Sequence, residues 1–159
     1  MTAPRPLVLG DLKIWSPDFA PDGPMPDRLS GWHEDEAPRL RVAGAPAGTV
    51  ELAIVCHDPD APRPRGFSHW TLYGLAPDAA EVDPPTLAGA RVGPNDRGER
   101  DWIGPRPPAG HGLHRYYFWV YALSRTVSGE PDRATFLAEY ADDIIEQARV
   151  VGTYERPAD

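Results

Sequence analysis

Two short polar segments carry the side chains that are best suited to chemistry. The first, 58–62, reads Asp-Pro-Asp-Ala-Pro and is followed by His69. The second, 104–116, begins Gly-Pro-Arg-Pro-Pro and ends His-Arg-Tyr. Four of the five histidines lie in or beside these segments. Carboxylates and imidazoles gathered in one cleft are typical of functional sites, acid–base catalysts among them.

The spacing of His114 and Tyr116 favours a shared face. Residues two apart on an extended segment point to the same side, so both side chains could donate hydrogen bonds to one bound oxygen. An aspartate that accepts from the other ring nitrogen would fix the tautomer of a histidine and keep it cationic. We therefore expect His69 and His114 to be cationic partners of a bound anion. The affinity for the anion should then weaken as the pH rises through the histidine range, because both histidines lose their positive charge.

Asp58 and Asp60 directly follow an apolar run, in a segment whose two prolines cannot continue a sheet. The prolines should hold both carboxylates in a stiff loop at the end of a strand. The alternative is ordinary turn chemistry, because Asp-Pro commonly begins a turn. The nearby histidines and tyrosine favour a polar pocket built from Asp58, Asp60, His69, His114 and Tyr116.

The segments that must position these side chains are predominantly strands. Apolar runs predict strands over 7–14, 38–42, 50–56, 69–75 and 116–123. The run 50–56 is apolar on both faces, so it should lie in mid-sheet between two layers.

One helix is predicted over 135–151, where apolar residues recur at helical spacing. Asp132 or Thr135 could cap its start, and Gly152 could close its end. Strands followed by a helix favour a β-sandwich-like core with a peripheral helix, in a single domain spanning 1–159.

The acidic composition disfavours several classes of partner. With 16 basic and 24 acidic residues the chain has a formal net charge of −8, which argues against nucleic acid and anionic lipid surfaces. Its one cysteine, Cys56, cannot form an internal disulfide. No apolar stretch is long enough to cross a membrane, and the N-terminal residues lack the apolar core of a signal peptide, so we expect a cytoplasmic protein.

The two polar segments resemble the signature regions of the phosphatidylethanolamine-binding protein family, which includes the Raf kinase inhibitor proteins. The resemblance extends over nearly the whole chain, because 16–26, 93–96, 102–105 and 152–154 are also similar to family blocks. It implies a mostly β fold of two packed antiparallel sheets with a C-terminal helix. It also implies no cofactor and a small anionic ligand, such as phosphate or a phosphoethanolamine head group.

The resemblance further implies a ligand pocket. Its residues here would be Asp58, Asp60, His69, Gly104, Pro107, His114 and Tyr116. The family also implies modulation of a kinase or protease, a homodimer as in bacterial relatives, and a cis peptide between Ala61 and Pro62. Two departures matter. The segment 63–67 is short, as in prokaryotic members, so kinase inhibition is not carried over. Arg106 stands where many bacterial members have a cysteine, and it would add a cation at the pocket rim.

An acid–base hydrolase or lyase is the alternative that uses the same aspartates and histidines. Nucleophilic catalysis is disfavoured for three reasons. Ser68 and His69 point to opposite faces of a strand, no Gly-x-Ser-x-Gly elbow exists, and Cys56 should be buried and inert.

A metal site is the third reading, since His111, His114 and Asp58 could bind zinc. Residues three apart on an extended chain point apart, however, so we expect no metal there. The aromatic residues leave a separate question open, because they cannot all be buried on one face; they are Trp15, Trp32, Trp102, Tyr117, Trp119 and Tyr121. They predict either burial on both sides of a sandwich or a homodimer surface.

Overall fold

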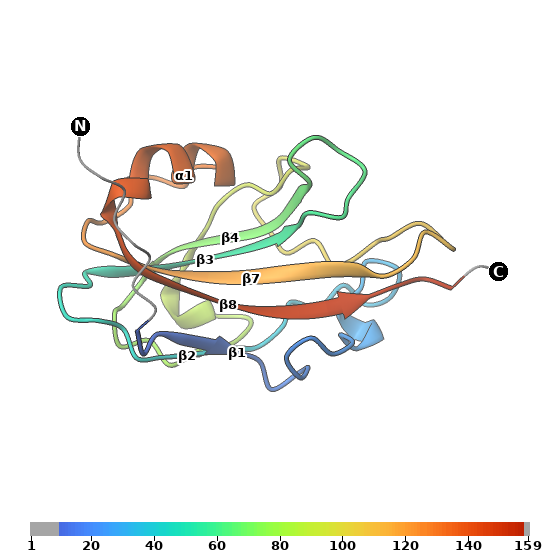
Figure 1. Ribbon diagram of the computed structural model, residues 1–159, viewed down its shortest axis with the longest axis horizontal. Coiled ribbons are helices and arrows are strands. Elements are labelled where there is room, and N and C mark those ends of the chain that lie inside the picture. Colours follow the sequence, from blue (N-terminus) through green and yellow to red (C-terminus); the bar gives the residue numbers. More distant parts are fainter. Residues whose placement is uncertain (1–9, 158–159) are drawn as a thin grey trace.

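The computed structural model describes residues 10–157 and shows three layers (Figure 1). The middle layer is an antiparallel sheet with the spatial order β6 (Arg91–Val92), β4 (Phe67–Leu75), β3 (Glu51–Asp58), β7 (His114–Leu123) and β8 (Ile144–Tyr154). A small antiparallel sheet of β1 (Lys13–Trp15), β2 (Leu40–Ala43) and β5 (Glu81–Val82) covers one face. The helix α1 (Arg133–Tyr140) covers the other. These layers confirm the predicted fold of two packed antiparallel sheets with a helix near the C-terminus.

Three short 3-10 turns lie in the connections; they are η1 (Asp27–Leu29), η2 (Leu87–Gly89) and η3 (Ala141–Asp143). Within residues 10–157, no helix combines the length and the apolar character needed to cross a membrane.

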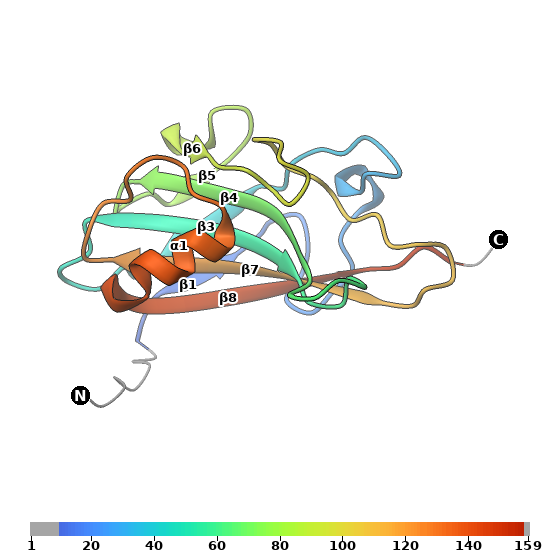
Figure 2. The same ribbon diagram turned by 90° about the horizontal axis from the view of Figure 1, so that it is seen from above.

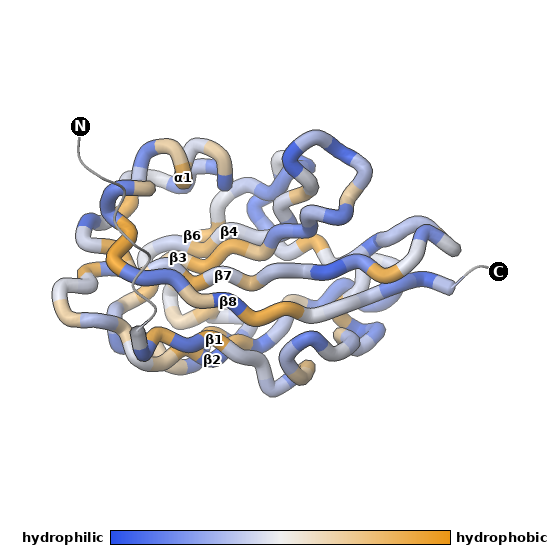
Figure 3. Tube along the Cα trace, viewed as in Figure 1, coloured by the Kyte–Doolittle hydropathy of each residue, from blue (hydrophilic) through white to orange (hydrophobic). Residues whose placement is uncertain are grey.

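The central strand β3 explains why the sheet is sandwiched between two layers. Leu52, Ile54 and Cys56 pack in the core beneath the small sheet, whereas Ala53 and Val55 pack in a second core under α1. The mid-sheet position predicted for 50–56 is thereby confirmed. Figure 3 shows apolar stretches along the strands and a hydrophilic loop where β3 leads into β4. Polar groups near the site therefore come from the ends of buried strands.

The helix predicted over 135–151 is wrong beyond Tyr140. Residues 144–154 form β8 instead, and they pair with β7 from Ile144 opposite Leu123 to Tyr154 opposite His114. Five of the eleven residues of β8 are β-branched, which favours an extended backbone. Even-numbered residues such as Glu146 and Val150 turn toward the core, so the strand period of two replaces the helical stripe.

The ends of these elements settle several smaller expectations. The side chain of Asp132 caps α1 by accepting a hydrogen bond from the backbone nitrogen of Thr135 at 2.8 Å, as predicted. Gly152 does not end a helix. It lies within β8, where a Cβ would press on Met25 and Phe19.

The first predicted strand is also shorter than expected, because β1 begins at Lys13, and residues 7–9 lie outside the described range. In the described part of the chain the cis peptide joins Pro84 to Pro85, so the cis bond expected between Ala61 and Pro62 is wrong.

The aromatic residues divide between core and surface. Trp102 is buried in the core beneath the small sheet and Tyr121 in the core under α1, as expected for a sandwich. Trp119 is half-buried beneath the guanidinium of Arg149, and Trp15 is 42% exposed. Two-sided burial therefore accounts for part of the set, and the homodimer surface stays a prediction.

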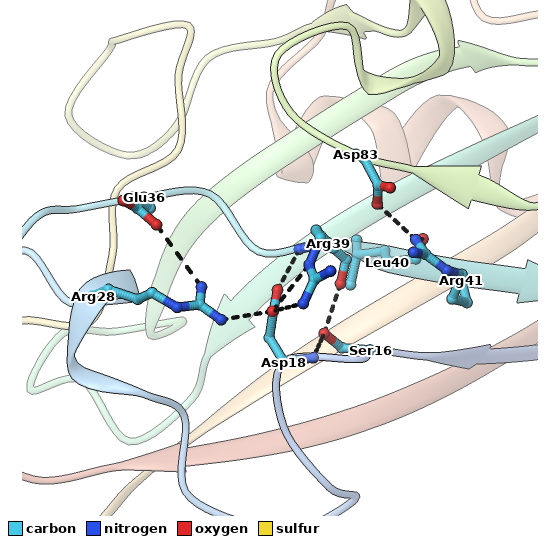
Figure 4. A network of polar contacts seen from close by, with 8 residues as sticks. All are labelled: Ser16, Asp18, Arg28, Glu36, Arg39, Leu40, Arg41 and Asp83. Carbon is cyan, nitrogen blue, oxygen red and sulfur yellow. Dashed lines mark hydrogen bonds and ion pairs between the residues drawn. The ribbon is translucent and has the colours of Figure 1, made fainter.

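A buried carboxylate fastens the long N-terminal loop to the small sheet (Figure 4). Asp18 accepts hydrogen bonds from the guanidinium groups of Arg28 and Arg39, each at 2.7 Å, and from the backbone nitrogen of Arg39 at 2.7 Å. Burial alone would raise the pKa of Asp18, but the hydrogen bonds from Arg39 and Arg28 outweigh burial and lower this pKa. Because Arg28 belongs to η1, the cluster fixes the start of the loop 27–35, which supports the candidate site described below.

We predict that Asp18→Asn destabilises the fold by about 2 kcal/mol at pH 7, a moderate value because both arginine partners are half-exposed and screened by water. The lowered pKa means that the stabilisation is present above about pH 4 and is lost as the pH falls through the folded-state pKa. Urea unfolding at pH 7 and pH 3 should therefore show a gap between wild type and variant that shrinks in acid. The exposed Asp78→Asn is the matched control and should leave stability unchanged; an equal loss in both variants would contradict the proposed anchor.

Candidate functional site

A cavity of about 430 Å³ lies at the end of the middle sheet where β3 stops and β4 and β7 begin. Figure 2 shows that the loop after β3 and the segment before β7 both lie at this end of the sheet. The polar residues inside the cavity are Asp58, His69, His114 and Tyr116, and Arg63, Arg97 and Arg106 are exposed residues that line its mouth. Side chains far apart in the sequence thus converge because antiparallel neighbours end and begin at one edge.

The innermost polar contact joins Asp58 to His114. The Nδ1–H of His114 donates to Oδ2 of Asp58 at 2.8 Å, and each side chain is 4% exposed. The second oxygen of Asp58 accepts from the backbone nitrogen of Asp60 at 2.7 Å. The predicted aspartate partner of a histidine is therefore present, and it fixes which nitrogen of His114 carries the inner proton.

His111 makes an unexpected contact with the same ring. The Nδ1 atom of His111 lies 2.6 Å from Nε2 of His114. His111 is exposed, whereas His114 is buried. The expectation that these two side chains point apart is wrong, because β7 begins only at His114 and Gly112 turns the preceding chain with a φ of +94°. Asp58, His114 and His111 form a hydrogen-bonded series rather than a shared ligand set, and the described residues contain no group of three side chains suited to a metal.

His69 has a different acceptor. Its Nδ1 lies 2.6 Å from the carbonyl oxygen of Ile103, and a carbonyl can only accept, so this nitrogen carries the hydrogen. Burial lowers the pKa of His69 to about 4, although the hydrogen bond to Ile103 acts in the opposite direction. His69 is therefore neutral at pH 7, and the expectation of a cationic ring held by an aspartate is wrong for this residue.

Tyr116 lies between the two histidines. Its ring centroid is 5.2 Å from that of His69, edge to face, and 6.4 Å from that of His114. Burial raises the pKa of the Tyr116 phenol, and the neighbouring Asp58 carboxylate raises it further. The hydroxyl has no hydrogen-bond partner among residues 10–157, so it remains a protonated donor that a ligand could use.

One wall of the cavity is the segment 102–108, which the loop 27–35 holds by hydrogen bonds. The backbone nitrogen of Gly104 donates to Oδ1 of Asp35 at 2.7 Å, and Trp32 Nε1 donates to the carbonyl oxygen of Pro107 at 3.1 Å. A Cβ at Gly104 would collide with the carbonyl oxygen of Leu29, so the close approach requires glycine. Gly104 and Pro107 therefore shape the wall, and the Gly104 N–H is already engaged within the protein.

Six of the seven residues predicted for the site line the cavity, and Asp60 does not. Asp60 is exposed, and its Oδ2 accepts from the backbone nitrogen of Arg115 at 2.8 Å. This contact ties the loop after β3 to the beginning of β7. Asp60 is thus placed to hold the loop in position from outside the cavity.

Of the three arginines at the mouth, the sequence predicts only Arg106. Arg106 lines the rim as expected and lies against Gly31. Arg63 also lines it, with its guanidinium 5.2 Å from the ring centroid of Phe67, and so does Arg97. Neither of the last two belongs to a motif; the only signal is their place in the loops that flank β4 and precede β7. The lining thus holds three arginines and one carboxylate, Asp58, although the chain as a whole is acidic, and Arg97 also pairs with Glu99 at 3.6 Å.

The comparisons with known proteins agree with this geometry. The family model described as phosphatidylethanolamine-binding protein matches residues 15–155. A Mycobacterium tuberculosis protein that bears the name of a lipoprotein, LppC, is 38% identical over 160 residues, covering 97% of this chain and 77% of that protein.

Two solved structures share the fold. The phosphatidylethanolamine-binding protein homolog CT736 of Chlamydia trachomatis has a TM-score of 0.85 and 29% identity, covering 92% of this chain and 99% of that one. YbcL of E. coli has a TM-score of 0.82 and 25% identity, covering 91% and 98%. The family model spans both polar segments and all the strands between them, so this chain belongs to the phosphatidylethanolamine-binding protein family.

Proposed function

We propose that this protein binds a small anionic ligand, a phosphate or a phosphorylated head group such as phosphoethanolamine, in the cavity beside Asp58 and His114. The observation that carries the proposal is the convergence of the free Tyr116 hydroxyl and three arginines on a cavity with a single carboxylate. Guanidinium groups and hydroxyl donors are the groups that proteins commonly offer to phosphate oxygens.

The size of the cavity supports a ligand larger than a bare phosphate. A volume of about 430 Å³ lies within the range of pockets that hold small organic ligands, on the order of 300–1,000 Å³. The walls also include apolar groups, from Pro62, Phe67, Ile103 and Pro107. A phosphorylated group with a short carbon chain would place its charge against the polar residues and its carbons against these walls.

The acid–base hydrolase or lyase is the second candidate, and the hydrogen-bonded series Asp58–His114–His111 is what favours it. The described lining holds no serine, threonine or cysteine, so such an enzyme would use a water molecule activated by a histidine, or one of the aspartate, histidine and tyrosine side chains, as its nucleophile. Cys56 is fully buried outside the cavity, and burial raises the pKa of its thiol well above the usual range. Phosphate release from phosphoethanolamine would support the hydrolase.

Partners and location remain predictions. Modulation of a kinase or protease, a homodimer and a cytoplasmic location are expectations from the sequence and its family. The lipoprotein name of the mycobacterial relative offers a membrane-anchored location as the competing proposal. Cell fractionation and light scattering would test location and oligomeric state.

We predict that Tyr116→Phe weakens phosphoethanolamine binding about tenfold, because the variant removes one hydrogen bond to a charged group and keeps the ring. Isothermal titration calorimetry at pH 7 would measure the change. Tyr117→Phe is the matched control, since its half-buried side chain lies outside the cavity. Equal affinities in wild type and Tyr116→Phe would remove Tyr116 from the site.

We predict that Arg106→Gln lowers the affinity for phosphoethanolamine by about two- to fivefold, since an exposed charge contributes on the order of 0.5–1 kcal/mol to binding. The loss should shrink in 0.5 M NaCl, because salt screens exposed charges. Arg115→Gln is the control, as that exposed side chain does not line the cavity. A loss that persists unchanged at high salt would argue against an electrostatic role.

We predict that His111→Ala strengthens binding a few fold. His111 now engages Nε2 of His114, and removing it frees that nitrogen for a ligand. The exposed His33→Ala serves as the control. Weaker binding in His111→Ala would instead make His111 a ligand-binding residue.

A further inference from the structure

We infer that the cavity selects an oxyanion that still carries a proton, such as dihydrogen phosphate or the monoanion of a phosphate monoester, over one that carries none, such as sulfate. The inference rests on the proposed function and concerns the same site. It starts from the floor of the cavity, where His69 and Tyr116 present groups that no residue of the range 10–157 satisfies.

His69 can offer only an acceptor to the ligand. Its Nδ1–H is committed to the carbonyl oxygen of Ile103 at 2.6 Å, so Nε2 is the nitrogen left for the cavity that the residue lines. In a neutral imidazole with Nδ1 protonated, Nε2 carries a lone pair and no hydrogen. A ligand atom that meets Nε2 must therefore bring a hydrogen of its own.

The surroundings of His69 oppose a second proton on the ring. The residue is 5% exposed and packs between the rings of Phe67 and Trp102, at centroid distances of 4.8 and 6.4 Å. A charge on His57 of β3 or on His114 of β7 lowers the pKa of His69 further. Burial is the largest contribution to the lowered pKa.

The other charged groups around the cavity do not reverse this balance. Asp58 on β3 is the carboxylate of the lining, and its two oxygens are engaged by His114 and by the backbone nitrogen of Asp60. The charged groups at the mouth are Arg63, Arg106 and Arg97, the last of which pairs with Glu99 at 3.6 Å. Asp58 would in addition repel the second charge of a dianion.

Tyr116 supplies the complementary donor. Its hydroxyl is protonated, and its ring lies 5.2 Å from that of His69. Two neighbouring rings of the lining therefore offer one donor, from Tyr116, and one acceptor, from His69. A protonated phosphate carries P–OH and P–O⁻ on one tetrahedral centre and satisfies both. Sulfate offers only acceptors, so its lone pairs would face the lone pair of Nε2, and a buried polar group without a partner weakens binding strongly.

Calorimetric titration of the full-length protein with inorganic phosphate and with sulfate, at pH 6.5 and constant ionic strength, tests the inference. We expect phosphate to bind on the order of 10- to 100-fold more tightly than sulfate. Equal affinities would overturn the selection of a protonated anion and leave the proposed anion site standing. If neither phosphate, sulfate nor phosphoethanolamine binds, the proposed function itself fails, and the inference fails with it.

Two variants separate the donor from the acceptor. His69→Gln can turn either end of its amide toward the ligand, so the preference for phosphate should collapse to within about threefold. Tyr116→Phe removes the donor that both anions use, so both affinities should fall while their ratio is kept. A ratio unchanged in a folded His69→Gln would overturn the role of Nε2.

A measurement on the unaltered protein does not depend on the folding of a variant. Nitrogen-15 NMR of the histidine rings in saturating phosphate should show His69 still neutral, with the hydrogen on Nδ1. A cationic His69 in the phosphate complex would contradict the inference, because the ring would then be a donor.

Discussion

The buried hydrogen bond between Asp58 and His114 is the contact on which the cavity depends. It joins the last residue of β3 to the first residue of β7, at the end of the sheet where β3 stops and β7 begins. Both groups are almost fully shielded from water. An unpaired charge is costly in such buried surroundings, so the two side chains hold each other in one orientation. Asp60 extends the same anchor outward by accepting from Arg115. The ring of His114 is thereby fixed in one orientation before any ligand arrives.

Another wall is positioned by loops, and hydrogen bonds between side chains and backbone groups hold those loops together. Ser30 and Trp32 donate to the carbonyl oxygens of Pro105 and Pro107, and Asp35 accepts from Gly104. Those prolines have no N–H to donate, which leaves their carbonyl oxygens to make the contacts. The loop in turn begins at η1, where Arg28 is held by Asp18. The cluster around Asp18, beside the small sheet, thus helps to place one wall of the cavity.

The sequence is most informative where a single period governs a segment. The run 50–56 and the pair His114 and Tyr116 were predictable because strand alternation and two-sided burial follow from local pattern. The segment after Tyr140 was not, because a helical stripe and a β-branched strand can share the same apolar residues, and pairing with β7 decides between them. Arg63 and Arg97 had no such pattern, since loop residues reach the cavity only through the three-dimensional path of the chain.

The two histidines of the cavity show why residue type alone could not assign their roles. Both donate from Nδ1, at 2.8 Å and 2.6 Å, and both are buried. The acceptor differs: a carboxylate carries a charge that favours an imidazolium, whereas a carbonyl dipole only partly offsets the cost of burying one. His69 meets the carbonyl of Ile103, and burial therefore dominates and lowers its pKa. His69 therefore offers a lone pair to the cavity, and the identity of its acceptor, which only the fold determines, could not be predicted from residue type.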